Sequence, residues 1–155
     1  MVNIFSSSPV LDNCLFSSNS ATNNGGGIWN EQSPSLTINN CEFSGNTAGQ
    51  NGGGMYNQSS SPVIEGCLFS GNTATQDGGG IYNFRESSPQ VIGCVFTGNS
   101  ASRGGGVRNY GESFTPSPVF RNSIFKGNLA TSWGGGMENT NCSPVISNCV
   151  FSGNQ

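Results

Sequence analysis

The chain has 155 residues, no histidine, a formal net charge of −3 and only 8% charged residues. This length fits a single domain spanning residues 1–155, and the low charge argues against disorder, which usually combines low hydrophobicity with high charge. The negative balance gives no reason to expect nucleic acid as a partner. No apolar run approaches the roughly 18 residues of a membrane helix, so we expect no membrane insertion of this segment.

One phrase returns six times along the chain. Its Phe-x-x-Asn units begin at Phe16, Phe43, Phe69, Phe96, Phe125 and Phe151. Its glycine triplets begin at Gly25, Gly52, Gly78, Gly104 and Gly134. Successive starts are 26 to 30 residues apart, and a period of this size predicts a solenoid, in which each unit packs only on its neighbours.

Each unit opens with a short apolar strand that is expected to end at a tight bend. The third position before the cysteine is always apolar and is expected to face inward: Leu11, Ile38, Ile64, Val91, Phe120 and Ile146. The position just before the cysteine holds only Asn or Gly: Asn13, Asn40, Gly66, Gly93, Asn122 and Asn148. Both residue types tolerate a left-handed backbone conformation, so we expect the chain to bend there.

A second strand begins at the cysteine, and a third follows the glycine triplet. By alternation, the cysteine and the phenylalanine two residues later share the inward face. We expect another turn at the Asn of Phe-x-x-Asn, and a small corner at the alanine two residues later. The third strand should point one apolar residue inward: Ile28, Met55, Ile81, Val107 and Met137. The asparagine that closes it is Asn30, Asn57, Asn83, Asn109 or Asn139. The sequence therefore predicts an all-β, right-handed parallel β-helix of about six coils with three short strands each.

The cysteines follow the same repeat. Five of the six occupy one column, in which Ser123 takes the fifth place: Cys14, Cys41, Cys67, Cys94 and Cys149. These spacings match no zinc pattern, so we expect no metal site, and nothing implies a cofactor. Stacked coils bring the thiols within disulfide range, but parallel Cβ vectors fit that bond poorly, which favours a ladder of buried free thiols. Cys142 lies off the column and is either a reactive thiol or an inert exposed one.

Two outward columns are candidate contact surfaces. The residue between Cys and Phe forms an apolar ridge, broken by Glu42: Leu15, Leu68, Val95, Ile124 and Val150. Such a ridge either mediates assembly or is covered by loops or by a neighbouring domain. The residue after the inward Ile or Met is aromatic in the early units: Trp29, Tyr56 and Tyr82. These rings either pack across the coils or form a platform that contacts glycans.

Catalysis has little support in the sequence. The acids occupy different places in different units and form no evident pair: Asp12, Glu31, Glu42, Glu65, Asp77, Glu86, Glu112 and Glu138. General acid–base chemistry on this fold would need a cluster of carboxylates. We therefore expect no catalytic residues and a protein that is not an enzyme.

The Phe-x-x-Asn and Gly-Gly-Gly-(Ile/Met/Val) units resemble the FxxN and GGA(I/L/V) repeats of chlamydial polymorphic outer membrane proteins. More broadly, they resemble right-handed parallel β-helix repeats of the pectate-lyase type. The chain has glycine, as at Gly27, where the first family often has alanine. The resemblance covers nearly the whole chain and implies a surface-displayed or secreted passenger, often an adhesin.

Both ends of the chain fall inside a repeat, so we expect a slice of a longer solenoid or a subunit that stacks end to end. The functional prediction is a non-catalytic structural protein at the bacterial surface or in the extracellular space. It would be a rigid rod for surface adhesion or for self-assembly into filaments, end to end or laterally, with a surface glycan or host-surface ligand as a further partner. The alternative is a polysaccharide-binding or polysaccharide-cleaving β-helix.

Overall fold

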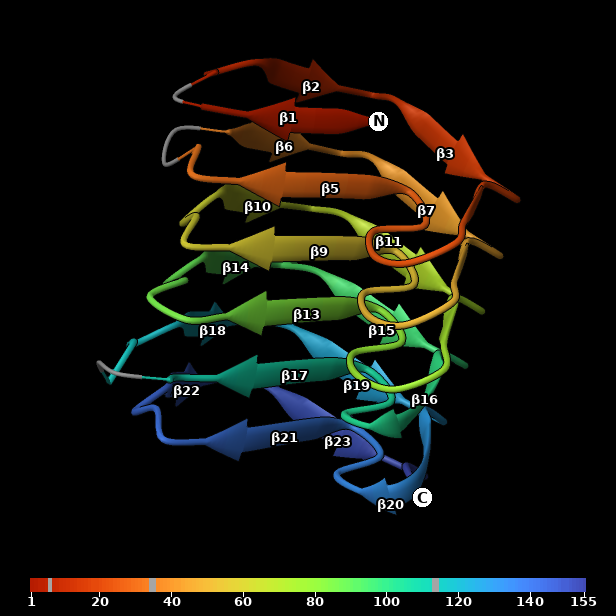
Figure 1. Cartoon of the computed structure of the whole chain (residues 1–155). Helices are drawn as coiled ribbons and strands as arrows, with labels where there is room; N and C mark the ends of the chain where they lie inside the picture. Colours follow the sequence, from red (N-terminus) through yellow and green to blue (C-terminus); the bar gives the residue numbers. More distant parts are fainter. Residues whose placement is uncertain (6, 34–35, 113–114) are drawn as a thin grey trace.

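The structure is a computed structural model that describes residues 1–5, 7–33, 36–112 and 115–155. Its strands stack into parallel sheets along one axis, so the chain winds from the N terminus at the top of Figure 1 to the C terminus at the bottom. Each pair of neighbouring strands joins equivalent positions of successive repeats, as Phe69 pairs with Phe43 and Phe96. The described residues include no helix of the length and hydropathy that a membrane crossing requires.

Four sheets run along the rod. Sheet A, at the front of Figure 1, contains β1 (Val2–Ile4), β5 (Ile28–Glu31), β9 (Met55–Gln58), β13 (Ile81–Phe84), β17 (Val107–Tyr110) and β21 (Met137–Thr140). Sheet B contains β2 (Val10–Asp12), β6 (Thr37–Asn39), β10 (Val63–Glu65), β14 (Gln90–Ile92), β18 (Val119–Arg121) and β22 (Val145–Ser147). Sheet C contains β3 (Leu15–Ser17), β7 (Glu42–Ser44), β11 (Leu68–Ser70), β15 (Val95–Thr97), β19 (Ile124–Lys126) and β23 (Val150–Ser152). Sheet D contains β4 (Ser20–Ala21), β8 (Thr47–Ala48), β12 (Thr73–Ala74), β16 (Ser100–Arg103) and β20 (Leu129–Trp133).

The predicted parallel β-helix is confirmed, but the coil has four strands rather than three. The alanine that was expected at a corner lies in a strand of sheet D, where Ala48 and Ala74 pair in register. Three strands of this sheet have only two residues, which is too short for alternation to be recognised in a sequence. Because sheet D has five strands and the others six, the four-stranded coil is complete five times.

The bends follow the predicted residue types, with one shift. All six Asn or Gly residues before the cysteine column have positive φ, from 50° at Asn40 to 62° at Gly93. The second bend was expected at the Asn of Phe-x-x-Asn, but it lies one residue earlier, as at Gly71 with φ 61°. Asn72 itself is buried. Because the chain bends at the residue before it, the asparagine side chain points into the interior.

Rings, amides and thiols fill the interior in separate columns. The Phe-x-x-Asn rings stack with centroids 4.6 to 4.9 Å apart and planes within 8° of parallel. Each of Cys14, Cys41 and Cys67 donates its backbone N–H to the sulfur of the next cysteine, at 3.3 to 3.4 Å. At the fifth place, the Ser123 hydroxyl accepts the Cys94 N–H at 3.2 Å. All six cysteines are free thiols, and burial raises the pKa of Cys41.

The amides of the Asn19 column, which contains Asn19, Asn46, Asn72, Asn99, Asn128 and Asn154, link coil to coil. The Asn46 side chain donates to the Asn72 side-chain oxygen at 2.9 Å and to the Phe16 carbonyl at 2.8 Å. The same Asn72 oxygen accepts the Asn46 backbone N–H at 3.0 Å. A second amide column joins Asn30, Asn57 and Asn83 in sheet A, by contacts of 2.8 to 3.2 Å. These bonds satisfy polar groups that the turns bring inside.

Candidate functional site

The predicted aromatic strip lies on sheet A but is not an open platform. Tyr56 is 4% exposed and Tyr82 is 6% exposed, so both rings follow the packing alternative rather than the platform alternative, while Trp29 is half-buried. The glycine triplets lie directly over the column, because a Cβ added at Gly78 would come within 2.7 Å of the Tyr82 Cβ. The rings pack across coils instead, with Tyr56 and Tyr82 centroids 5.6 Å apart.

This column changes from rings to charges in the last coils, where Arg108 and Glu138 follow Tyr82. Arg108 is 4% exposed and forms ion pairs with Asp77 and with Glu138, the latter at 2.7 Å. Arg103 binds both carboxylate oxygens of Asp77, at 2.8 and 3.1 Å. The guanidinium of Arg108 also lies over the Tyr82 ring. We call Asp77, Arg103, Arg108 and Glu138 the Asp77 cluster.

The Asp77 cluster is built to hold coils together. Its two carboxylates engage two guanidinium groups, which are permanent cations and cannot accept a proton. The pairs span different coils, as Arg103 and Asp77 are 26 residues apart in the sequence. Neither carboxylate is therefore a free base. Among the described residues, no group of three or more His, Cys, Asp or Glu side chains has a geometry that could hold a metal ion.

A second aromatic feature of sheet A escaped the sequence analysis. Phe84 and Tyr110 are half-buried and stack at 5.9 Å with planes 15° apart. Arg85 lies over the Phe84 ring at 5.1 Å and pairs with Glu112 at 2.9 Å. The sequence does contain these two aromatic residues, two positions after the predicted strip in each repeat. The column they occupy is aromatic in only two coils, so it was not recognised. Its equivalents are Glu31 and Gln58 in the earlier coils.

The predicted ridge lies on the outer face of sheet C. Its five residues follow one another in register, with Glu42 between Leu15 and Leu68. Leu15 is 64% exposed, Ile124 41% and Val150 54%. Leu68 and Val95 are half-buried. The structure therefore brings all five predicted residues together in one outward column.

The adjoining sheet B adds apolar residues that the sequence analysis did not single out. Val10 and Val145 are 67% and 48% exposed, and Val63 and Val119 are half-buried. All four are the first outward position of sheet B, in register with Thr37 and Gln90. The alternation of apolar and polar residues in this column concealed it. Exposed and half-buried apolar residues therefore lie on both sheet B and sheet C, next to the ridge.

Comparison with known proteins agrees with this architecture. No curated protein and no solved structure matches the chain significantly. The family model described as "Right handed beta helix region" matches residues 2–151, which is nearly the full length of the chain. The repeat, the four parallel sheets and this match lead to one conclusion: the chain belongs to the right-handed β-helix family.

Proposed function

We propose that this chain is a non-catalytic structural protein of the bacterial surface or the extracellular space. It acts as a rigid rod for surface adhesion or for self-assembly. The observation that carries the proposal is the pair of continuous ladders, in which stacked rings and amides tie every coil to the next. Close-packed protein interiors have low compressibility and transmit strain, so we expect such a rod to resist bending.

The outer surface suits a protein that makes repeated contacts. Because successive coils pair in register, each outward column is a stripe parallel to the rod axis. A stripe of similar groups can make many weak contacts at once, and linked contacts raise the overall affinity well above that of any single one. The ridge is the stripe that self-association would use, since exposed contiguous apolar residues tend to be contact surfaces. The resemblance of the repeats to surface-displayed passengers supports the location outside the cell.

Sedimentation velocity and electron microscopy of the purified chain over a wide concentration range test this proposal. We expect association that rises with concentration and that weakens at least about tenfold in Leu68→Lys/Val95→Lys, because each pair of copies would then bury uncompensated charge. The matched control is Thr47→Lys/Thr73→Lys, which adds the same charge on neighbouring strands of sheet D, where both threonines are exposed. A wild-type chain that stays monomeric and adheres to no surface would contradict the proposal.

A second candidate is a polysaccharide-binding or polysaccharide-cleaving β-helix, and one observation favours it. The half-buried Phe84 and Tyr110 rings lie beside the exposed Arg85–Glu112 ion pair. Rings next to charged groups that can hydrogen-bond provide the apolar and polar contacts that ligand sites combine. On a glycan array, we expect retention that is lost in Phe84→Ala and Tyr110→Ala but kept in Thr73→Ala on sheet D. An array on which the wild type retains no glycan removes this candidate.

A further inference from the structure

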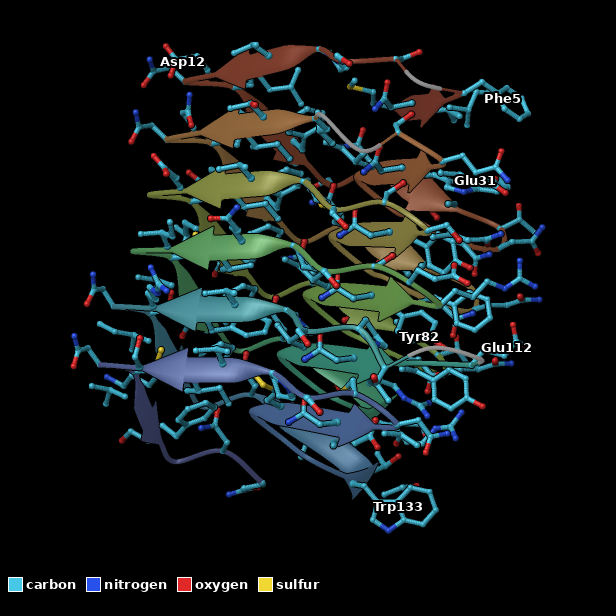
Figure 2. The ribbon with its side chains drawn as sticks, turned by 90° about the vertical axis from the view of Figure 1, so that its left-hand side faces the viewer. Phe5, Asp12, Glu31, Tyr82, Glu112 and Trp133 are labelled. Carbon is cyan, nitrogen blue, oxygen red and sulfur yellow. The ribbon has the colours of Figure 1, made fainter. Side chains whose placement is uncertain are left out.

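We propose that the corner between sheets B and C is the interface of an antiparallel, two-fold symmetric dimer, so that the partner is a second copy of this chain. The inference rests on the self-association proposed above and specifies its geometry. It follows from how apolar and charged residues are distributed along this corner. The corner is at the left edge of Figure 2, where the strands of sheet B end and Asp12 is labelled.

The apolar part of the corner is the ridge. Counting the six strands of sheet C in order, the ridge has Leu15 on β3, Leu68 on β11, Val95 on β15, Ile124 on β19 and Val150 on β23. Only β7 breaks it, with the exposed Glu42. A partner that covers this stripe must therefore supply a positive charge opposite β7 and apolar side chains elsewhere.

The charges on the corner are separated by sign along the rod. Three exposed acids lie on the first three coils, at Asp12, Glu42 and Glu65. Two exposed bases, Arg121 and Lys126, lie on β18 and β19. Within the described residues, none of the five belongs to an ion pair, whereas Arg85, Arg103 and Arg108 are all paired. Figure 2 shows Glu31 and Glu112 on the opposite edge of the rod, far from Asp12.

A two-fold axis perpendicular to the rod, between β11 and β15, fits this distribution. It places β3 opposite β23, β7 opposite β19 and β11 opposite β15 of the second copy. Leu68 then meets Val95, and Leu15 meets Val150. Glu42 meets β19, where Ile124 is flanked by the Arg121 and Lys126 columns. Every contact occurs twice, as in any isologous interface.

The same axis also accounts for the remaining acids. It places Arg121 opposite Asn39, which occupies the same column of sheet B. Asp12 and Glu65 are the neighbours of Asn39 in that column, one strand to either side, at a spacing of about 4.8 Å. Arg121 of one copy therefore lies between two acids of the other. Two copies in parallel would instead place Glu42 against Glu42, and like charges in contact disfavour that arrangement.

Charge reversal tests the arrangement on the intact 155-residue chain. The first variant is Glu42→Lys and the second is Lys126→Glu; both positions are exposed, and both variants keep a net negative charge. We expect each variant alone to self-associate at least about tenfold more weakly than the wild type, because each opposes like charges. An equimolar mixture should form one-to-one heterodimers with an affinity within about threefold of wild type, since opposite charges then meet again.

The control is Glu86→Lys, which makes the same change of charge at an exposed residue in the turn after sheet A. It should self-associate as the wild type does and gain no affinity for the second variant. A wild-type chain that associates while the mixture stays as weak as its components overturns the antiparallel arrangement and leaves self-association standing. A wild-type chain that never associates overturns both. Sedimentation velocity with one variant fluorescently labelled separates these outcomes.

Discussion

In the middle coils, the asparagine amide of the Asn19 column is buried and fully hydrogen-bonded. Asn72 donates to the Phe43 carbonyl at 2.8 Å and to the Asn99 side chain at 2.9 Å. Its oxygen accepts from the backbone and the side chain of Asn46, at 3.0 and 2.9 Å. No water can replace these partners at a fully buried position. The position therefore requires an amide, which accepts hydrogen bonds from Asn46 in one neighbouring coil and donates one to Asn99 in the other.

Asn72→Ala should lower the free energy of unfolding by about 2–4 kcal/mol, because it leaves the Asn46 N–H buried without a partner and removes the side-chain bond to the Phe43 carbonyl. Urea denaturation followed by circular dichroism measures this change. The control is Thr73→Ala at the next residue, which is exposed and should alter stability by less than about 0.5 kcal/mol. Equal effects of the two substitutions would show that the amide ladder adds nothing to stability.

The two buried tyrosines, Tyr56 and Tyr82, make the free energy of unfolding depend on pH in the alkaline range. Burial raises the pKa of Tyr56 to about 12 and also raises the pKa of Tyr82. An unfolded tyrosine ionises near pH 10, so the stabilisation from Tyr56 is complete below that pH and is lost as the pH rises toward 12. The free energy of unfolding should fall over this range and fall less steeply in Tyr56→Phe. Identical pH slopes for the two proteins would contradict the prediction.

At the scale of the strand, the close approach of neighbouring backbones decides where glycine is required. Gly79 sits where successive glycine triplets meet, and an added Cβ would lie 2.4 Å from the Gly105 carbonyl oxygen. Gly71 has the opposite constraint, since its φ of 61° is left-handed but nothing lies within 4 Å of an added Cβ. The triplet is therefore required for packing, whereas the glycine before the asparagine is required only for its backbone angle.

Gly79→Ala should cost more than about 3 kcal/mol, since the contact is with backbone that cannot move aside. Gly71→Asn should cost less than about 1 kcal/mol, because asparagine tolerates the left-handed region and Ser18 already occupies it in the same column. Thermal unfolding of the two variants, monitored by circular dichroism, compares the costs. Similar melting temperatures would contradict this account of the triplet.

The sequence predicted the inward columns because each has one residue type at one place in every repeat. Ile64, Cys67 and Phe69 were identified in this way, and all three are buried. It did not predict sheet D, whose shortest strands have two residues, and it left open whether Tyr82 packs across the coils or faces solvent. Alternation within a strand states which side of the sheet a residue faces, but not whether a loop covers that side. For this reason the sequence left two alternatives open for the aromatic column, and the structure shows the packed one for Tyr56 and Tyr82. No glycine triplet lies over the ridge, and its residues are exposed or half-buried.

At the scale of the whole molecule, stability accumulates along one dimension. Each coil contacts only its neighbours, so a coil between two others is held on both faces. Phe69 is fully buried between Phe43 and Phe96, whereas Phe151 stacks on Phe125 alone and is 45% exposed. The same substitution should therefore have different effects at different places along the rod.

Phe69→Ala should cost about 3–5 kcal/mol and Phe151→Ala less than half as much, because the second ring buries less surface. Urea denaturation of both variants gives the two costs. Hydrogen exchange of the wild type should show the slowest amides in β11 and β15 and faster exchange in β23, since terminal coils open at lower free energy. Uniform protection from end to end would contradict a one-dimensional rod.

The direction of the Asn19 column has an electrical consequence. Each side-chain oxygen faces the preceding coil, where it accepts a backbone N–H, so the carbonyl bonds of Asn46, Asn72 and Asn99 all point toward the N terminus. Backbone bonds in parallel sheets alternate in direction and largely cancel, but aligned amides add. A single rod thus carries a permanent dipole moment along its axis. In an applied electric field it aligns with the same end always toward the same electrode. Two rods running in opposite directions cancel that moment, so electric birefringence would report antiparallel pairing as a loss of permanent-dipole orientation.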